Sequence, residues 1–522
     1  MTRFVLPLAI LTASAASLQA NVTLPALFSD HMVLQRGVPA TVWGWADKDE
    51  DVSVSIAGQT KSTKANADGK WRLKLDPLTV GEPQTMTVKG KNAITINDVL
   101  VGEVWLCSGQ SNMGFHVMQA DNFPAEKEAA THPKLRMFTE ASGAATQPQD
   151  HGRGTWIVCS PETVGPFSAT AYFFGRELHD KLGVPVGLVH SSVGGTPIEA
   201  WTSLEAQKDV PQVKFIFDDW EKRTGTWDPA KASENYNRQK AEWQEAADKA
   251  KANGTKPPTP PRAPVDPRVD IHRPANLFNG KIAPLIPYTI RGAVWYQGES
   301  NADTIERGRA YATQLPLLVA DWRKRWGYDF PVAWVQLPEF QARSSDGWSL
   351  VREAMLKSLS IPHTGMAIAL GLGTVHNIHP PHKQEVGKRV AAWALSEVYG
   401  EKTPSSGPIY ASNHVDGSNI TITFTHADGG LAAKDGTLKG FTIAGEDKSW
   451  KPAVAKIDGN KVIVSTPDGS KAVAVRYAWG SNPEFSLTNG AGLPASPFRT
   501  DNWEISPTAP VAPASQAEAP AP

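Results

Sequence analysis

The 522-residue chain lacks the features that mark several large classes of protein. Lys+Arg total 52 against Asp+Glu 53, giving a formal net charge of −1, so no basic excess points to a nucleic-acid partner. No Gly-rich phosphate loop or dinucleotide fingerprint stands between a strand and a helix. After the first twenty residues, no apolar run is long enough to span a bilayer. We therefore expect no nucleic acid, no membrane span and no cofactor.

The first twenty residues have the pattern of a secretory signal peptide. Arg3 precedes an apolar run from Phe4 to Leu11, and small residues follow as far as Ala20. This order of charge, apolar core and small residues predicts cleavage near Ala20–Asn21. We expect the mature protein to be exported, either to the periplasm or out of the cell.

Cysteine is scarce, and only Cys107 and Cys159 occur. An exported compartment permits a disulfide, and both residues lie at the ends of apolar runs in the same predicted domain. Two buried free thiols agree equally well with the pattern. Nothing in the sequence indicates the oligomeric state.

The length predicts several domains. Residues 21–98 alternate polar and apolar positions and predict an N-terminal β-sandwich. Residues 99–400 mix buried strands with helical stretches, which predicts an α/β domain of flavodoxin-like strand order with an insertion at 211–274. Alternation returns at 405–504 and predicts a second β-sandwich-like domain. The tail, 505–522, is rich in Ala and Pro and is expected to be disordered.

Polar, glycine-rich segments follow several short apolar runs in the α/β region. Continuous apolar runs are typical of parallel strands buried on both faces, and ligands bind at the carboxyl ends of such strands. The segments are therefore predicted to converge on one site. They are Cys107-Ser-Gly-Gln-Ser111, Ser191-Ser-Val-Gly-Gly-Thr196, Gln297-Gly-Glu-Ser-Asn301 and His376-Asn-Ile-His-Pro380.

The same motifs resemble the sialate O-acetylesterase family of SGNH-type hydrolases. The resemblance rests on Gly109-Gln-Ser-Asn-Met113, Gly194-Gly-Thr-Pro-Ile-Glu-Ala-Trp201, Trp295-Tyr-Gln-Gly-Glu-Ser-Asn301 and Ile378-His-Pro380, with flanking Leu27–Gln35 and Gly492–Thr500. It covers about 21–503 and implies a three-layer α/β/α serine esterase that acts on O-acetylated carbohydrate. Sialic acid is the implied substrate. Acetylated xylan or xyloglucan is an alternative, because related SGNH esterases act on them and none of these motifs identifies the sugar.

Ester hydrolysis needs a nucleophile, a base and donors for the developing oxyanion. Ser111 is the predicted nucleophile and His379 the predicted base. The predicted oxyanion donors are the backbone N–H of Ser111, that of Gly194 or Gly195, and the side-chain amide of Gln297, which the resemblance favours. Each has a structural alternative: a helix N-cap for the serine, a plain turn for the glycines and a buried hydrogen-bonding role for the glutamine.

The histidine segment departs from the family pattern. An aspartate usually stands two or three residues before the catalytic histidine, where it fixes the imidazole tautomer and stabilises the imidazolium. Asn377 and His376 occupy those positions here. Asn377 can orient the ring but supplies no charge, and Glu299 and Asp303 are the carboxylates that could substitute. The open alternatives are a Ser–His dyad, a substituted triad, and a carbohydrate-binding protein without catalysis.

Two further interpretations concern histidine and tryptophan. The spacing of His376, His379 and His382 also suits zinc, but Pro380-Pro381 prevents one helix from presenting the rings together, so no metal is expected. The chain holds 18 tryptophans, and aromatic faces stack on sugar rings. We expect Trp201 and Trp295, which adjoin the site motifs, to line the substrate cleft.

Overall fold

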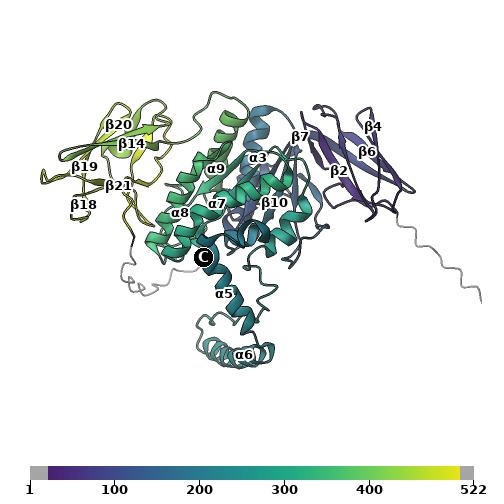
Figure 1. The fold of residues 1–522 in the computed structure, drawn as a ribbon, viewed down its shortest axis with the longest axis horizontal. Helices are drawn as coiled ribbons and strands as arrows, with labels where there is room; N and C mark the ends of the chain where they lie inside the picture. The colour runs from purple at the N-terminus through teal and green to yellow at the C-terminus, as the bar shows by residue number, and fades with distance from the viewer. Residues whose placement is uncertain (1–20, 506–522) are drawn as a thin grey trace, which may run out of the picture.

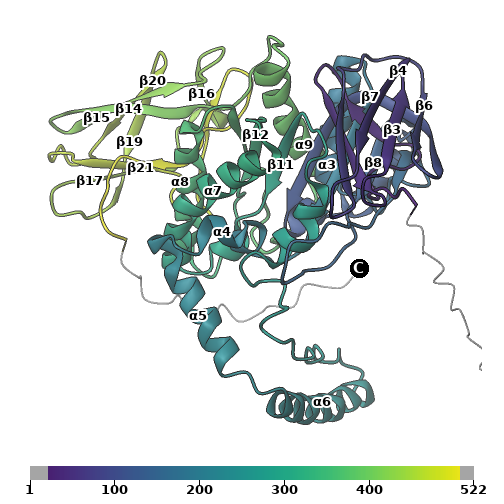
Figure 2. The same ribbon diagram turned by 45° about the vertical axis from the view of Figure 1, so that its right-hand side comes forward.

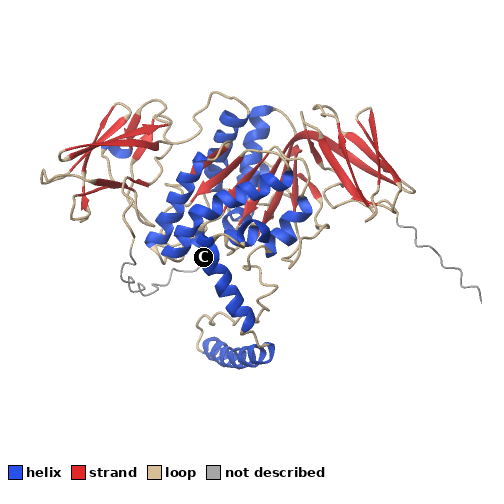
Figure 3. Cartoon of the chain, viewed as in Figure 1, coloured by secondary structure: helices blue, strands red, loops and turns tan. Residues whose placement is uncertain are grey.

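The structure is a computed structural model that describes residues 21–505. The predicted leader (1–20) and, except for Ile505, the predicted tail lie outside the described residues. A strand-rich part comes first along the chain, then a part that mixes strands and helices, then a second strand-rich part (Figures 1 and 3). Within 21–505 no helix combines the length and the apolar character needed to cross a membrane.

The long strand β7 (Ala93–Gly109) joins the first part to the central sheet. Its first half pairs antiparallel with β6 (Gln84–Lys89) and alternates between exposed and buried positions. From Val99 onward every residue is buried, because this half runs parallel to neighbours on both sides and both of its faces are covered. The sequence of β7 changes from alternating polar and apolar residues to a continuous apolar run at the point where the strand enters the central sheet.

The central sheet has the order β13-β12-β11-β7-β10-β8-β9. Five of its parallel strands, taken in chain order as β7, β10, β11, β12 and β13, lie in the order 2-1-3-4-5, and parallel β8 and antiparallel β9 extend the edge. In this arrangement the chain turns to opposite sides of β7, and ligands bind at such a switch point. The bounds are β8 (His132–Thr139), β9 (Trp156–Cys159), β10 (Val186–Ser192), β11 (Gly292–Tyr296), β12 (Val332–Gln336) and β13 (Thr364–Ile368).

Helices cover both faces of this sheet (Figure 2). On one face α3 (Ala169–Leu182) packs beside α9 (Lys383–Trp393), and on the other α7 (Ile305–Trp326) packs beside α8 (Ser345–Lys357). The side chains of β7 alternate between these two cores: Trp105 packs with α3 and α9, whereas Leu106 belongs to the core of α7 and α8. The predicted α/β class is confirmed.

Short strands make up the rest of the sheet structure at the two ends of the chain; at the first end β1, β3 and β4 connect with β7 through its pairs with β1 and β6, whereas β2 and β5 form a separate sheet. The first group is β1 (Val33–Gln35), β2 (Ala40–Trp45), β3 (Asp51–Ile56), β4 (Gln59–Lys64) and β5 (Lys70–Leu75). The last group is β14 (Ile409–Asp416), β15 (Asn419–Thr425), β16 (Leu431–Ala433), β17 (Phe441–Ala444), β18 (Lys451–Pro452), β19 (Val454–Asp458), β20 (Lys461–Ser465), β21 (Ala474–Tyr477), β22 (Leu487–Asn489) and β23 (Phe498–Arg499).

A helical arm projects from the body of the molecule (Figures 1 and 2). It holds α5 (Lys214–Gly225) and α6 (Pro229–Ala252), and it follows the short α4 (Leu204–Gln207). The carboxylate of Asp228 caps α6 by accepting the N–H groups of Ala230 and Lys231. Only Ala247 of α6 is buried, so the arm contributes little to the core.

The two cysteines are both buried and both free, so the disulfide alternative is wrong. Cys107 lies on β7 and Cys159 on β9, three strands away in the sheet order. Strands lie about 4.8 Å apart, so the two residues are at least about 14 Å apart, beyond the reach of a disulfide. Burial raises the pKa of the Cys159 thiol to about 12 and raises that of Cys107 as well.

Candidate active site

Ser111 stands immediately beyond the carboxyl end of β7, as the first residue of the short helix α1 (Ser111–Gly114). The turn before it requires a glycine. Gly109 has φ +144°, and a Cβ there would lie 2.1 Å from the carbonyl oxygen of Tyr296 on β11. The N-cap position of α1 belongs to Gln110, whose side chain makes no capping bond. The hydroxyl of Ser111 is therefore not used as a cap.

His379 lies on the loop between β13 and α9, and its ring meets the serine. Its Nε2 is 2.8 Å from Ser111 Oγ, so the hydroxyl can donate to a neutral imidazole. Partial burial lowers the pKa of His379, and the positive charge of Lys383 lowers it further. A lowered pKa keeps the ring uncharged, and able to accept a proton, at neutral pH.

Asn377 orients the loop and not the ring. Its Oδ1 accepts the backbone N–H of His379 at 2.9 Å. In the described part of the chain, no hydrogen bond reaches Nδ1 of His379. Asn377 therefore does not take the place of the usual aspartate, although it stabilises the turn that presents the histidine.

The two substitute carboxylates do not contact the histidine either. Oε1 of Glu299 accepts a hydrogen bond from Nδ2 of Asn112 at 2.5 Å, and its buried Oε2 has no partner among residues 21–505. Burial raises the pKa of Glu299. Asp303 is exposed, and burial of part of its carboxyl raises its pKa as well. The predicted substituted triad is not formed.

Two buried side chains tie the nucleophile turn to the histidine loop. Nδ2 of Asn112 donates to the carbonyl of Ile378 at 3.0 Å. Nζ of Lys383 donates to Oδ1 of Asn112 at 2.7 Å and to the carbonyl of Pro380 at 2.6 Å. We call Asn112 and Lys383 the clamp. It holds the residues on either side of His379 against the residue that follows Ser111.

The surroundings of Lys383 are unusual for a lysine. Its side chain is fully buried, and its Nζ lies 4.8 Å from the ring centre of Phe115 and 5.5 Å from that of Tyr296. Burial lowers the pKa of Lys383 to about 7, against the opposing effect of Glu299. The motifs in the sequence do not point to this residue, although it stands only four residues after His379.

Backbone donors for an oxyanion stand beside the serine. A Cβ placed on Gly194 would lie 3.3 Å from Cβ of Ser111, so this stretch of backbone contacts the serine. The N–H groups of Ser111, Gly194 and Gly195 donate no hydrogen bond to another described residue. Gly195 has φ +73°, in the left-handed region that glycine adopts readily. These free donors fit the predicted oxyanion site.

Gln297 is not free to join them. Its Nε2 donates to the carbonyl of Thr196 at 3.1 Å and to Oδ1 of Asn301 at 2.7 Å, and its Oε1 accepts from Tyr311 at 3.0 Å. With both amide hydrogens engaged, the side chain has none left for an oxyanion. The structural alternative is the correct one for this residue.

A buried network fixes the loops that follow β10 and β11. Glu199, after β10, accepts from Arg307 at 2.5 Å, from Asn301 at 2.9 Å and from Gln314 at 3.0 Å. Asn301 also accepts the backbone N–H of Ile198 at 3.0 Å. We call Glu199, Asn301, Gln314 and Arg307 the carboxylate network. It joins the segment after β10 to the segment after β11.

The tryptophan prediction is wrong. Trp201 and Trp295 are both 0% exposed. Their rings pack edge to face with centroids 6.1 Å apart, and Trp295 makes a similar contact with Trp322 at 5.8 Å. These rings belong to the core between the sheet and α7, so they cannot line a cleft.

The three histidines of the His376 segment have separate partners. His379 meets Ser111, His382 pairs with Asp121 at 2.5 Å, and His376 is exposed. The only described group of histidine, cysteine and acidic residues close enough together for a metal ion lies elsewhere, at His132, His179 and Asp180.

Known proteins resemble this chain in sequence and in fold. The profile of the family described as "Carbohydrate esterase, sialic acid-specific acetylesterase" matches residues 101–218 and 276–396. The mouse sialate O-acetylesterase is 30% identical over 526 residues, which covers 90% of this chain and 92% of that protein. The human protein of that name is 28% identical over 524 residues, covering 90% and 91%. A crystal structure of a carbohydrate acetylesterase from Xanthomonas citri superposes with a TM-score of 0.78 and 34% identity, covering 92% of this chain and 100% of that one.

Fold, site and relatives together define a carboxylic ester hydrolase, an acetylesterase that acts on sugars. The match extends over nearly the whole of both chains, so it is not confined to one shared domain. The chain belongs to the sialic acid-specific acetylesterase family of carbohydrate esterases.

Proposed function

We propose that the chain is an exported serine esterase that releases acetate from O-acetylated sialic acid through an acetyl-serine intermediate. The observation that carries the proposal is the 2.8 Å contact between Ser111 Oγ and His379 Nε2. A serine and a neutral histidine in hydrogen-bonding contact form an activated nucleophile.

The reaction proceeds in two halves. In the first, Oγ of Ser111 bonds to the acetyl carbonyl carbon while its proton passes to Nε2 of His379. The tetrahedral intermediate then collapses, its bond to the sugar oxygen breaks, and the imidazolium returns the proton to that oxygen. In the second half, water gives a proton to His379 and attacks the carbonyl carbon of acetyl-Ser111; the bond from that carbon to Oγ then breaks, and the imidazolium returns the proton to Oγ as acetate leaves.

The negative oxygen of each intermediate is placed against backbone N–H groups. Those of Ser111 and Gly194 are the nearest candidates, and Gly195 adds a third. Such fixed donors stabilise charge that develops only in the transition state, and removing one typically costs about 10²–10³-fold in turnover.

The base works here as one half of a dyad. A triad aspartate has two roles: it orients the ring, and it stabilises the imidazolium. We propose that the clamp and Asn377 carry out the first role by fixing the loop on both sides of His379. No described carboxylate stabilises the imidazolium in this dyad, and the lowered pKa of His379 agrees with the absence of such a charge.

Two measurements test the substrate and the nucleophile. Acetate release from O-acetylated sialic acid should exceed release from acetylated xylan, because the curated relatives are named sialate O-acetylesterase. The reverse order would favour the plant-polysaccharide alternative.

Ser111→Ala should abolish release from either sugar, whereas Ser233→Ala, at an exposed serine of α6, should leave it unchanged. Full activity of Ser111→Ala would overturn the serine mechanism, and a folded wild type that binds glycans without releasing acetate would support the binding-protein alternative.

Export and domain organisation are part of the same proposal. We propose that the leader at 1–20 is removed and that the domains run over 21–98, 99–400 and 405–504. The strand-rich parts on either side of the central sheet support this division. N-terminal sequencing of the protein recovered from the periplasm or the medium should begin near Asn21; an uncleaved cytoplasmic protein would contradict export.

A further inference from the structure

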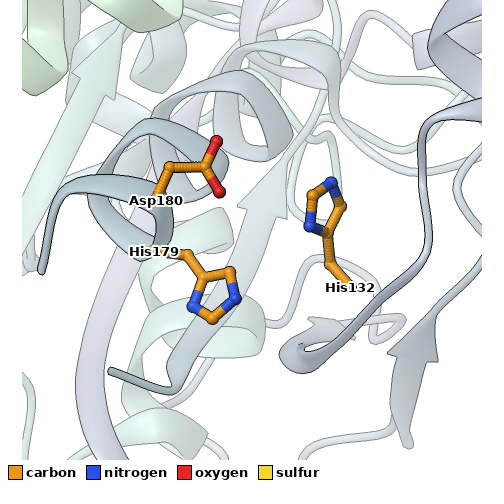
Figure 4. Close-up of side chains that lie close together, drawn as sticks. All are labelled: His132, His179 and Asp180. Carbon is orange, nitrogen blue, oxygen red and sulfur yellow. The ribbon is translucent and has the colours of Figure 1, made fainter. Parts of the chain in front are cut away.

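A cluster of metal-ligating side chains lies away from the catalytic serine. It holds His132, the first residue of β8, and His179 and Asp180, near the end of α3. One ligand atom from each lies within 4.8 Å of the other two, and the three side chains face a common space (Figure 4). We propose that these residues bind a divalent transition-metal ion that prefers imidazole nitrogen, of the Zn²⁺ type, and that the ion links α3 to the edge of the sheet.

The hydrogen bond of His179 holds its ring in the tautomer that can bind a metal. Nδ1 lies 2.7 Å from the carbonyl oxygen of Val184. A carbonyl can only accept, so Nδ1 carries the proton and Nε2 presents a lone pair. Metal-binding histidines typically have one nitrogen held by a carbonyl or carboxylate in this way, which fixes the tautomer and the direction of the other.

His132 is half-buried and lacks the hydrogen-bond partners that its buried nitrogen would normally have. Neither of its ring nitrogens makes a hydrogen bond to a residue between 21 and 505, and its Nε2 is fully buried. A buried polar atom without a partner is costly and calls for an ion, a water or another explanation. Coordination of this ring to a metal would offset part of that cost.

The carboxylate of Asp180 is the third ligand, and its exposed position lets an ion reach the cluster from solvent. It is exposed, and it makes no ion pair with another described residue. The centre of an equilateral triangle with 4.8 Å sides is about 2.8 Å from each corner, whereas zinc bonds to nitrogen and oxygen are about 2.0–2.2 Å. An inward shift of less than 1 Å, mostly by the mobile carboxylate, would close the site, and water would complete the coordination.

The neighbouring charge does not oppose a cation strongly. Arg176 lies one turn before Asp180 on α3, but its guanidinium is paired with Glu126 and lies over the rings of Tyr172 and Phe173. Two neutral imidazoles and one carboxylate together carry a single negative charge, which attracts a divalent cation. Softer nitrogen ligands favour zinc, nickel and copper over magnesium and calcium.

The cluster is at the opposite end of the sheet from Ser111. His132 precedes the residue of β8 that pairs with Val186 of β10, whereas Ser111 follows the residue of β7 that pairs with Ser192. Six residues of strand separate the two pairs, or about 20 Å at about 3.3 Å per residue. The ion is therefore expected to affect stability without affecting acetate release.

Equilibrium dialysis of the tag-free protein against Zn²⁺, after treatment with a chelator, tests the proposal. The wild type should bind one Zn²⁺ per chain, and saturating Zn²⁺ should raise its Tm by about 5 °C with unchanged turnover. His179→Ala and the exposed Asp180→Asn should each lose the bound zinc and the shift. The matched control is His272→Ala, which removes a histidine from a surface pair with Asp270 that has no second histidine; it should behave as the wild type.

Three results would overturn the proposal. They are no zinc bound by the wild type, zinc retained in full by both cluster variants, and equal loss in His272→Ala. Because Asp180→Asn changes one exposed side chain, a failure to fold in His179→Ala would still leave a decisive variant.

Discussion

The two sides of the active site are held in different ways. The oxyanion side, after β10 and β11, rests on the carboxylate network, in which Glu199 alone accepts three hydrogen bonds in a fully buried setting. The histidine side rests on a partly exposed loop that is held through its backbone by Asn377 and the clamp. No carboxylate contacts the ring within the described chain.

This contrast separates two tasks of a serine esterase site. Oxyanion donors must be fixed before charge develops, because their value lies in requiring no rearrangement during the reaction. The base must be placed correctly and must be neutral, and backbone contacts can provide placement without a charge. Among the described residues, the histidine side has no carboxylate placed to stabilise the protonated imidazole ring.

The largest effect is expected on the oxyanion side. Glu199→Gln puts a donor where three donors converge and leaves Arg307 without its buried partner, which should cost about 3 kcal/mol of stability. Urea unfolding measures the cost. Glu205→Gln is the matched control, since Glu205 makes only exposed ion pairs with Arg325 and Lys324 and should cost under about 1 kcal/mol. Equal effects would show that the network is not the support we describe.

The clamp comes next. Lys383→Met keeps much of the buried volume but removes the bonds to Asn112 and Pro380, so the histidine loop should shift and kcat should fall about 10–100-fold with little change in KM. Lys388→Met, at an exposed lysine of the same helix, should have no effect. A fall in kcat that is equal in both variants, or absent in both, would contradict the positioning role.

The pH dependence of kcat/KM tests the protonation state that we propose for His379. In the proposed dyad neutral His379 is the active form, and its pKa is lowered, so kcat/KM should hold as pH falls from 7 and then decline through an apparent pKa below about 6.5. Lys383→Met removes a nearby positive charge, so in that variant the decline should move to higher pH. A wild-type decline centred above pH 7 would be incompatible with this environment.

The smallest effect is expected from Asn377→Asp. An aspartate there can accept the same backbone N–H of His379, and its charge should raise the pKa of the ring while turnover changes less than about tenfold. In a serine protease, replacing the triad aspartate by asparagine costs about 10⁴-fold. A gain approaching that size here would mean that residue 377 contacts the ring and that our description of the loop is wrong. Asn237→Asp on the exposed arm is the control.

Some of this site could be predicted from sequence, and the reasons are physical. Ser111, Gly194 and His379 were identifiable because polar motifs that end buried parallel runs must meet at one edge of a sheet. The clamp was not identified, because Asn112 and Lys383 become partners only when loops 271 residues apart in sequence are brought together.

The errors have a common cause. Trp201 and Trp295 were assigned to the cleft because they adjoin the site motifs, and Gln297 was assigned to the oxyanion site because the resemblance places its Gln-Gly-Glu motif there. The sequence does not reveal whether a side chain in or beside such a motif points into the cleft or into the core, and all three of these side chains are fully buried. The disulfide alternative failed in a similar way, because strand order in the sheet is not strand order in the chain.

We propose that His379 activates Ser111 without a carboxylate partner. The most direct measurement is the rate at which a fluorophosphonate labels the protein, with the modified residue located by peptide mass spectrometry. The account predicts a single label on Ser111 in the wild type, a rate unchanged in His376→Ala and a rate at least about 100-fold lower in His379→Ala. Labelling of another residue, or an unchanged rate in His379→Ala, would contradict it.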